Sequence, residues 1–257
     1  MSIGRPLTAG ATGWLRTRDL AETSRISYDM HSTQNWTQVR GRGKFLKKEI
    51  VDAALAVALE RLGPPNVLVG HRVISAGDEH ALLAGEIVSF RASGLLARRQ
   101  SGAARLVARQ LLGKLGIDCA ELPRSASGAP VWPLGLVGSL AHDRSVAVAA
   151  VASADRFGAV GIDIEPAQPL PSELVDMVTT PTERAQYPAE ILQSRLLFAI
   201  KEATYKAVNP LDHCFLDFHD VTVDLAANQA FIRNGRKINF AVGTGPRIVA
   251  LAYVEAH

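Results

Sequence analysis

The segment VGIDIEP, Val160 to Pro166, places two carboxylates in a run that otherwise has the composition of a buried strand. Residues two apart in a strand share a face, so Asp163 and Glu165 point the same way while Ile162 and Ile164 point into the core. Like charges at that spacing repel, so either one carboxyl takes a proton or a cation lies between them. Two oxygen ligands without a nearby histidine or cysteine suit Mg²⁺ better than zinc. The alternative is an exposed strand end with two solvated acids.

A second segment, Leu192 to Val208, is predicted to form a helix and contains FAIKEATYKA. Glu202 and Lys206 are four residues apart in it, so they share one helix face. One interpretation is an ordinary surface salt bridge, which contributes little stability. The other is a third carboxylate for a metal and a lysine for a phosphate, because Mg²⁺ commonly uses a few carboxylates together with phosphate oxygens. Strand and helix together indicate a candidate diphosphate site.

A third segment, Leu95 to Leu115, is also predicted to be a helix, and its charge is one-sided. No acidic residue occurs from Ser89 to Ile117, whereas the basic residues there are Arg91, Arg98, Arg99, Arg105, Arg109 and Lys114. A solvated surface face is the usual explanation for such a run, but solvated faces normally mix the two signs. Anion binding is the alternative, since three of these arginines fall near one helical face.

Composition limits the classes of protein to which the chain can belong. Its 257 residues are 47% hydrophobic, enough for one large domain or two small ones. The net charge of +3 is too small to indicate nucleic-acid binding, and the arginine-rich helix has almost none of the aromatic residues that such a site uses. No run approaches the roughly 18 apolar residues of a membrane helix. Cys119 and Cys214 lack metal-type spacing, which fits a reducing cytosol.

The order of the predicted elements favours an α+β fold. A helix is predicted over Lys44–Leu62, and strands over Asn66–Ile74 and, as a hairpin, Ser145–Ala152 with Phe157–Glu165. Closing strands are predicted at residues 220–225, 229–233, 238–242 and 247–254. Helices and strands do not alternate as regular βαβ units, which disfavours a doubly wound sheet. The segment Met1–Gly43 shows little periodicity and no export signal, and we interpret it as a poorly ordered extension.

These motifs together resemble those of a known family. VGIDIE followed by FAIKEATYK resembles the signature pair of the phosphopantetheinyl transferases, and is most similar to their enterobactin synthetase component D branch. GAPVWPLGLVGSLAHD, TTPTE and FLDF also resemble family motifs and occur in the expected order, after the arginine-rich helix. The resemblance covers roughly Lys44 to the C-terminus.

The resemblance implies both a fold and a reaction. The fold would be two similar α+β halves, residues 44–155 and 156–257, related by a pseudo-twofold, with coenzyme A in the cleft between them. The reaction would transfer 4'-phosphopantetheine from coenzyme A to a serine hydroxyl of an apo acyl or peptidyl carrier protein. It would require Mg²⁺ and release 3',5'-ADP. The resemblance further implies a monomeric enzyme that activates carrier proteins in secondary metabolite biosynthesis. The cysteine content and the weak, aromatic-poor positive charge separately predict a cytoplasmic protein with no nucleic-acid partner.

Matching motifs carry the family's metal and catalytic roles to four residues. Asp163, Glu165 and Glu202 would hold Mg²⁺ against the diphosphate of coenzyme A. Glu202 would also be the base for the serine proton, directly or through a water, and which of its roles dominates stays open. Lys206 would contact the diphosphate. Phosphoryl transfer depends mostly on positioning and charge neutralisation, so these residue types suit the reaction.

The remaining expected contacts are to the phosphates of coenzyme A. His142 matches the family's histidine near a phosphate, and Lys201 is a candidate second cation. For the 3'-phosphate the candidates are Arg98, Arg99 and Arg105, because arginine makes fork-like contacts to phosphate oxygens. Of these three, Arg105 matches a Gly-Arg step in the family's helix. The same positive surface could instead steer an acidic carrier protein.

The sequence departs from the family pattern at Ala129, Ala141 and Ala199, which replace positions that are often basic, serine, and a small hydroxyl or thiol residue. These changes affect substrate contacts and leave the three metal carboxylates intact, so we expect an active enzyme. The alternative is a non-catalytic protein of the same fold that binds coenzyme A or a nucleotide as a regulator. The intact set of Asp163, Glu165, Glu202 and Lys206 favours the enzyme.

Overall fold

The computed structural model describes residues 53–256 apart from residues 92, 119 and 188–191. The predicted extension, residues 1–43, and the first part of the helix predicted from Lys44 lie outside this range. Residues 53–60 are helical, as predicted for the rest of that helix. Within the described residues, no helix combines the length and the apolar character needed to span a membrane.

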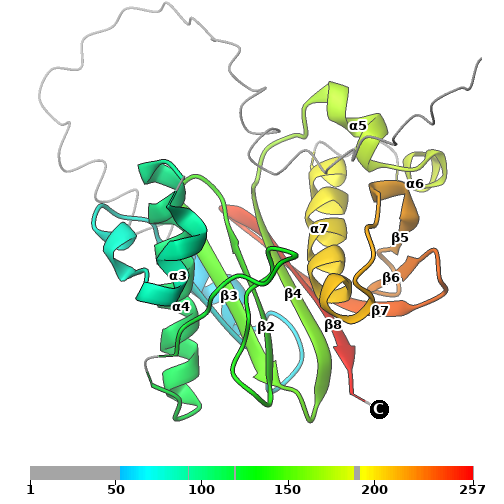
Figure 1. Cartoon of the computed structure of the whole chain (residues 1–257). Coiled ribbons are helices and arrows are strands. Elements are labelled where there is room, and N and C mark those ends of the chain that lie inside the picture. The colour runs from blue at the N-terminus through cyan, green and yellow to red at the C-terminus, as the bar shows by residue number, and fades with distance from the viewer. Residues whose placement is uncertain (1–52, 92, 119, 188–191, 257) are drawn as a thin grey trace, which may run out of the picture. The chain divides into compact units, whose positions relative to one another are not determined.

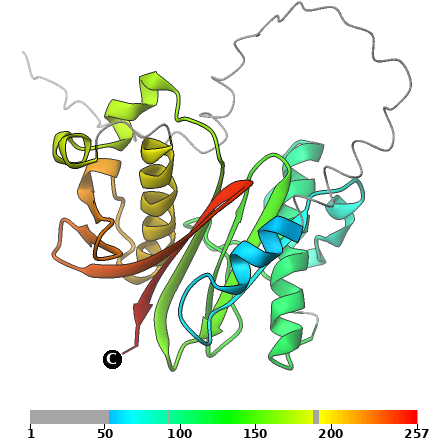
Figure 2. The ribbon, with the colours of Figure 1, turned by 180° about the vertical axis from the view of Figure 1, so that it is seen from behind.

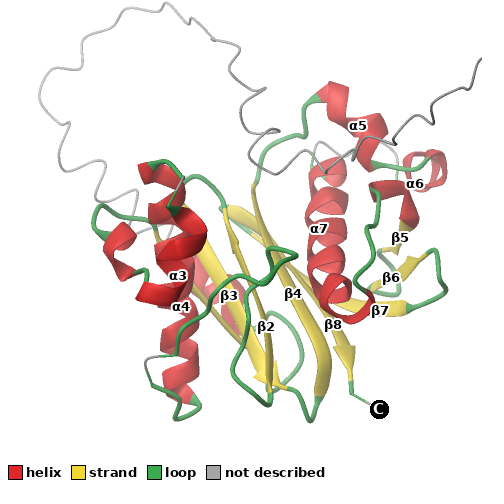
Figure 3. Ribbon diagram, viewed as in Figure 1, coloured by secondary structure: helices red, strands yellow, loops and turns green. Residues whose placement is uncertain are grey.

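The first sheet has three antiparallel strands in the order β1-β3-β2. Figure 3 labels two of them, β2 and β3. They are β1 (Leu68–Val73), β2 (Leu136–His142) and β3 (Val146–Ser153). The central strand β3 is buried on both faces, which explains its continuous run of alanines and valines. Alternate residues of this strand face different layers, and Ala149 and Val151 pack with the helix α4 (Leu95–Lys114).

The opposite face of β3 packs against a second cluster. Val148 and Ala150 belong to the same hydrophobic cluster as Leu55 and Leu59 of the helical segment 53–60, which Figure 2 shows as the blue helix. Three short elements connect β1 to α4: η1 (Asp78–Ala81), α3 (Ala84–Ile87) and η2 (Val88–Phe90).

The second sheet has five antiparallel strands in the order β4-β8-β7-β6-β5. They are β4 (Phe157–Pro166), β5 (Val221–Asp224), β6 (Gln229–Ile232), β7 (Lys237–Thr244) and β8 (Arg247–Glu255). One face is covered by the helix α7 (Gln193–Asp212), which stands beside β4 and β8 in Figure 1. Three short elements precede or follow α7: α5 (Ser172–Val178), α6 (Pro181–Gln186) and η3 (Phe218–Asp220).

The strand β4 presents different chemistry on its two faces. Ile162 and Ile164 are buried in the cluster that also contains Val148 of β3, so their predicted direction is confirmed. Gly161 lies on the other face, where a Cβ would be 2.0 Å from the carbonyl oxygen of Ala203. Only glycine permits this close approach of α7 to the strand. The side chains of β4 that follow Gly161 on this face therefore lie directly beneath the helix.

The predicted α+β class is confirmed, and each sheet is covered by a helix of 20 residues. The predicted boundary between halves, near Asp155, falls in the turn between β3 and β4. The clusters described above join the two sheets, because Val249 and Leu251 of β8 pack with residues of β3. The division into residues 44–155 and 156–257 stays a prediction.

Candidate functional site

The centre of the site is an ion pair between β4 and α7. Asp163 lies on the face of β4 beneath α7 and is only 4% exposed. The Lys206 ammonium lies 2.6 Å from Oδ1 of this carboxylate. Oδ2 of Asp163 is also buried, and no described residue gives it a hydrogen bond. A buried, unsatisfied carboxylate oxygen is costly, so this atom is a position where a bound cation or donor would be stabilising.

Glu165 lies one strand step further along β4 and has its own cation. Nη1 of Arg195, in the first turn of α7, lies 2.8 Å from Oε2 of Glu165. The same guanidinium donates to the carbonyl oxygens of Gln168 and Pro169. Burial raises the pKa of the Glu165 carboxyl to about 8; the Asp163 carboxylate adds to this shift, and Arg195 opposes it. Glu165 is therefore held in place by Arg195, which is itself anchored to the segment that links β4 to α5.

Glu202 is the third carboxylate, on the face of α7 that packs toward β4. It is 6% exposed. Burial raises the pKa of the Glu202 carboxyl to about 7, Lys206 opposes the shift and Asp163 adds to it. Burial alone would lower the pKa of the Lys206 ammonium, but the carboxylates around it, Asp163 first, raise it. Asp163, Glu202 and Lys206 are therefore close enough to influence one another electrostatically. Their assignment with Glu165 to one metal and diphosphate site stays a prediction.

The carboxylates do not form a ready-made metal cage. Among the residues that the structure describes, no group of three or more His, Cys, Asp or Glu side chains is arranged to hold a metal ion. Two of the three predicted ligands instead pair with Lys206 and Arg195. The donor set is nevertheless all oxygen, which suits Mg²⁺, and Oδ2 of Asp163 is available. A divalent ion therefore fits this site chemically, in competition with Lys206 for Asp163.

A cavity of about 530 Å³ lies beside these residues. Its walls come from residues 124–132, the strands β2 and β4, and the second half of α7. Lys206 lines the cavity, so one side chain connects it to Asp163. No described lining residue is acidic, and the polar side chains include Arg124, Ser127, Ser139, Tyr205, Lys206 and Asn209. The cavity is suited to an anionic ligand whose charged end contacts Lys206 and so lies close to Asp163.

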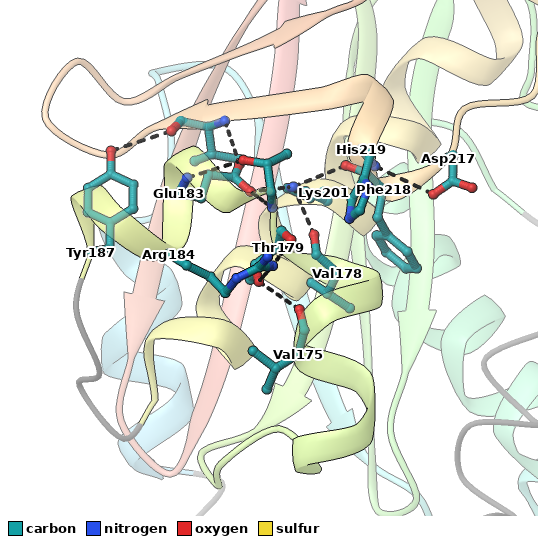
Figure 4. A network of polar contacts seen from close by, with 12 residues as sticks. Val175, Val178, Thr179, Glu183, Arg184, Tyr187, Lys201, Asp217, Phe218 and His219 are labelled. Atoms are coloured by element: carbon teal, nitrogen blue, oxygen red, sulfur yellow. Dashed lines mark hydrogen bonds and ion pairs between the residues drawn. The ribbon is translucent and has the colours of Figure 1, made fainter.

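Lys201 does not belong to this site. It is 1% exposed, and its ammonium lies 2.7 Å from Oε2 of Glu183. It also donates to the carbonyl oxygens of Val178 and Phe218, as Figure 4 shows. Glu183 in turn accepts hydrogen bonds from the backbone N–H groups of Thr180 and Val223. Lys201 therefore connects α7 directly to α5, α6 and η3, and through Glu183 to β5. This arrangement gives no support to its predicted contact with a phosphate.

Arg105 is likewise enclosed within the first half of the fold. It is 3% exposed, and Nε donates to the carbonyl oxygen of Leu122 over 2.9 Å. The Glu86 carboxylate lies 3.6 Å from the same nitrogen. Burial lowers the pKa of the Arg105 guanidinium to about 10, and Glu86 opposes this shift. The guanidinium of Arg105 is therefore occupied by partners inside the fold, and its position does not support the predicted contact with a 3'-phosphate.

The other predicted cations are more accessible. Arg99 makes a two-point ion pair with Glu79, and Arg98 is half-buried on α4. His142 ends β2 and is exposed. Of the predicted cations, only Lys206 lines the cavity.

Two arginines that the sequence analysis did not select are close to the site. Arg195 pairs with Glu165. It precedes Glu202 by two helical turns, so the helical period alone could have indicated it. Arg124 lines the cavity next to Ser125 and Ser127. It is isolated in the sequence between loop residues, and no local pattern marked it.

Comparisons with known proteins agree with the motifs. A model of the 4'-phosphopantetheinyl transferase N-terminal domain matches residues 91–152, and a model of the 4'-phosphopantetheinyl transferase superfamily matches residues 159–251. The chain is 40% identical to the 4'-phosphopantetheinyl transferase Npt of Nocardia iowensis over 143 residues, 54% of this chain and 64% of that protein. It is 41% identical to PptT of Mycobacterium tuberculosis over 46% of this chain and 54% of that protein.

A third relative, the 4'-phosphopantetheinyl transferase Svp of Streptomyces mobaraensis, is 41% identical over 45% of this chain and 50% of that protein. The chain therefore spans between half and two thirds of the length of these relatives. Among solved structures, the holo-acyl-carrier-protein synthase of Thermotoga maritima matches 39% of this chain and 65% of that one at 19% identity. Its TM-score of 0.30 is too low to support a fold assignment.

Proposed function

Because the chain belongs to the 4'-phosphopantetheinyl transferase superfamily, we propose that it transfers 4'-phosphopantetheine from coenzyme A to a serine hydroxyl of an apo carrier protein. The products are the holo carrier protein and 3',5'-ADP. The observation that carries this proposal is that Asp163, Glu202 and Lys206 interact at the edge of a cavity whose described lining residues include no acid. We also propose that the enzyme acts as a monomer in the cytoplasm.

Coenzyme A would bind with its adenosine bisphosphate part in the cavity. The volume of about 530 Å³ is within the usual range for pockets that hold small molecules. Lys206 lies at the boundary between the cavity and the carboxylates, so its ammonium is positioned to bind the diphosphate. When the ligand arrives, the Lys206 ammonium would leave the Asp163 carboxylate and pair with the diphosphate instead. The pantetheine arm would then extend away from the cavity, toward the carrier protein.

Asp163, Glu165 and Glu202 would hold Mg²⁺. This assignment is supported by the unsatisfied Oδ2 of Asp163 and by the purely oxygen donor set. The ion, when bound, supplies charge neutralisation for the diphosphate and for the leaving 3',5'-ADP. Arg195 keeps Glu165 in a fixed orientation beside Asp163. Which of Glu165 and Glu202 contributes more to ion binding is open to direct measurement.

Glu202 is also suited to the role of base. In the absence of a bound ion, burial raises the pKa of the Glu202 carboxyl to about 7. A general base with a pKa near the ambient pH combines a useful unprotonated fraction with proton affinity. Glu202 would take the serine proton as the hydroxyl oxygen attacks the phosphorus nearest pantetheine. The P–O bond to 3',5'-ADP breaks in the same displacement, and Lys206 offsets the charge on the departing phosphate. Burial of Glu202 on the face of α7 that packs toward β4 keeps bulk water away from this carboxylate.

The proposal is tested by weighing a carrier protein. The chain is incubated with coenzyme A, Mg²⁺ and an apo carrier protein, and the carrier's mass is measured with the released 3',5'-ADP. We expect a gain of one phosphopantetheine group, and no gain for Glu202→Gln, which should keep its fold. Glu173→Gln is the matched control, because Glu173 is exposed on α5. Coenzyme A binding without a mass gain, across several carrier proteins, would support the non-catalytic alternative instead.

A further inference from the structure

An ion pair joins the two sheets beside the end of β2. Asp143 follows the last residue of β2, and its Oδ2 accepts a hydrogen bond from Nε of Arg247, the first residue of β8. Nη2 of the same guanidinium donates to Oγ of Ser145 over 2.7 Å. Asp143 and Arg247 are 104 residues apart in the chain. We call Asp143, Ser145 and Arg247 the clasp, because they connect the turn between β2 and β3 to the second sheet.

The Asp143 carboxylate also organises the turn from which it projects. Its Oδ1 accepts hydrogen bonds from the backbone N–H groups of Ser145 and Val146 over 2.6 and 2.7 Å. The carbonyl oxygen of Asp143 accepts a hydrogen bond from Nε2 of Gln100 on α4. The Asp143 side chain is only 6% exposed, so water competes little for these contacts. One carboxylate oxygen therefore fixes the turn, and the other binds the cation from β8.

The clasp lies at the far ends of two strands that border the cavity. Residues 136–140 of β2 and 158–160 of β4 line the cavity, and these strands lie side by side but belong to different sheets (Figure 1). Near the starts of the strands the chain itself connects them, because Leu136 pairs with Ser153, just before the turn that leads into β4. At the other end, Asp143 follows β2, and Arg247 pairs with Pro166, the last residue of β4. Apolar packing between the sheets is non-directional, whereas a charge-assisted hydrogen bond fixes one geometry.

We propose that Asp143 and Arg247 are positioning residues for coenzyme A, because their ion pair holds the β2 wall of the cavity at a fixed distance from the β4 wall. This inference rests on the proposed function, which supplies coenzyme A as the ligand. Neither residue lines the cavity, so both act through the strands that they join. The proposed catalytic side chains all lie on β4 and α7, within the second sheet and its helix. Loss of the clasp therefore loosens the binding wall and leaves the catalytic side chains in place.

The test separates the affinity for coenzyme A from the rate of transfer. Isothermal titration calorimetry with Mg²⁺ gives the Kd of coenzyme A, and the transfer assay gives KM and kcat, for Arg247→Gln, Arg247→Lys, Asp143→Asn and the double variant Asp143→Asn, Arg247→Gln. Asp143→Asn removes the charge, while its amide oxygen can still accept from the turn. Arg72→Gln is the matched control: Arg72 pairs with Asp78, a similarly buried aspartate that also accepts from the backbone of Ser75, but this pair links β1 to η1 in the first part of the fold. Circular dichroism and thermal unfolding show that each variant is folded at the assay temperature.

We expect Arg247→Gln and Asp143→Asn each to weaken coenzyme A binding and to raise KM by about threefold to tenfold, with kcat within about twofold of the wild type. The double variant should bind no more weakly than either single variant, because both changes remove the same contact. Arg247→Lys should recover part of the affinity, since its ammonium can still pair with Asp143. Arg72→Gln should lower the thermal unfolding midpoint and keep the wild-type Kd.

The proposal is overturned if Arg247→Gln binds coenzyme A as the wild type does, if kcat falls while KM is unchanged, or if the losses add in the double variant. It is also overturned if Arg72→Gln weakens binding equally, since a general loss of stability would then explain the effect. The calorimetry contains no carrier protein, so a protein whose clasp variants lose affinity but that never modifies a carrier would contradict the proposed function alone. A protein that modifies a carrier, and whose Arg247→Gln variant keeps the wild-type KM, would contradict this inference alone.

Discussion

The Lys206 ammonium lies 2.6 Å from Oδ1 of Asp163, while Oδ2 of the same buried carboxylate has no hydrogen-bond partner among the described residues. One cation therefore neutralises the charge of Asp163 without satisfying all of its oxygen atoms. The ion pair joins β4, which carries Asp163, to α7, which carries Glu202 and Lys206. It also leaves Oδ2 of Asp163 as a defined place for a second cation.

Lys206→Met should destabilise the free protein, because it leaves the Asp163 charge buried without its partner. We expect a loss of about 2 kcal/mol in the free energy of unfolding, below the value for fully buried pairs since Lys206 is partly exposed. Mg²⁺ should restore part of the loss by replacing the ammonium. Urea unfolding with and without Mg²⁺ measures both effects. An unchanged stability, or no response to Mg²⁺ beyond that of the wild type, would contradict this account.

The pH dependence of stability should report the half-buried carboxyl of Glu165. Its pKa is raised to about 8 in the folded protein from an ordinary value of 4.5, so the folded state holds a proton that the unfolded state has released. Its contribution is complete below pH 4.5 and is lost as the pH rises toward 8. The metal-free wild type should therefore lose more stability between pH 5.5 and 8.5 than Glu165→Gln does.

The measurement for this pH dependence is urea unfolding of both proteins at several pH values in a chelating buffer. Glu173→Gln, at an exposed position on α5, is the control and should follow the wild-type curve. Parallel curves for the wild type and Glu165→Gln would show that this carboxyl does not change its pKa on folding.

Lys201→Met should be among the most damaging single substitutions for stability. It would leave Glu183 as a buried charge without its cation, and breaking such a pair typically costs about 3–5 kcal/mol. The double variant Glu183→Gln, Lys201→Met should recover part of the loss. Arg233→Gln breaks an exposed pair with Asp220 and should cost no more than about 1 kcal/mol. Equal effects of Lys201→Met and Arg233→Gln in urea unfolding would contradict the structural role of Lys201.

Arg105→Ala should affect stability rather than ligand affinity. The substitution removes the hydrogen bond to the Leu122 carbonyl and the packing on Phe90, for an expected loss of about 2–4 kcal/mol. At a temperature where the variant is fully folded, its Kd for coenzyme A should match that of the wild type. A weakened Kd with unchanged stability would instead restore the 3'-phosphate role that the sequence suggested for Arg105.

The sequence alone predicted the part of the site that depends on the side-chain periodicity of a strand or a helix. The alternation of β4 placed Ile162 in the core and Asp163 on the other face, and the helical period placed Glu202 with Lys206. In these elements, the side chains on one face are buried in the core, so the side chains on the opposite face must point away from it. The fold class could be predicted from the order of the elements, because helices and strands do not alternate as regular βαβ units.

The roles of the basic residues could not be predicted in this way. Lys201 and Arg105 look like candidate phosphate ligands in the sequence, but each meets a glutamate from a distant segment, Glu183 and Glu86. Only the tertiary structure brings such partners together. Arg124 shows the converse, because its place on the cavity wall depends on the packing of a hairpin against Phe90.

The dependence of coenzyme A affinity on Mg²⁺ tests most directly whether Asp163, Glu165 and Glu202 hold one ion against the diphosphate. Calorimetry would measure the Kd of coenzyme A for the wild type and Glu202→Gln, with Mg²⁺ and with a chelator. We predict that Mg²⁺ tightens wild-type binding by at least about tenfold, equivalent to 1.4 kcal/mol, and that Glu202→Gln loses most of this gain. A wild-type Kd that is the same with and without Mg²⁺, or a full gain in Glu202→Gln, would contradict the shared ion site.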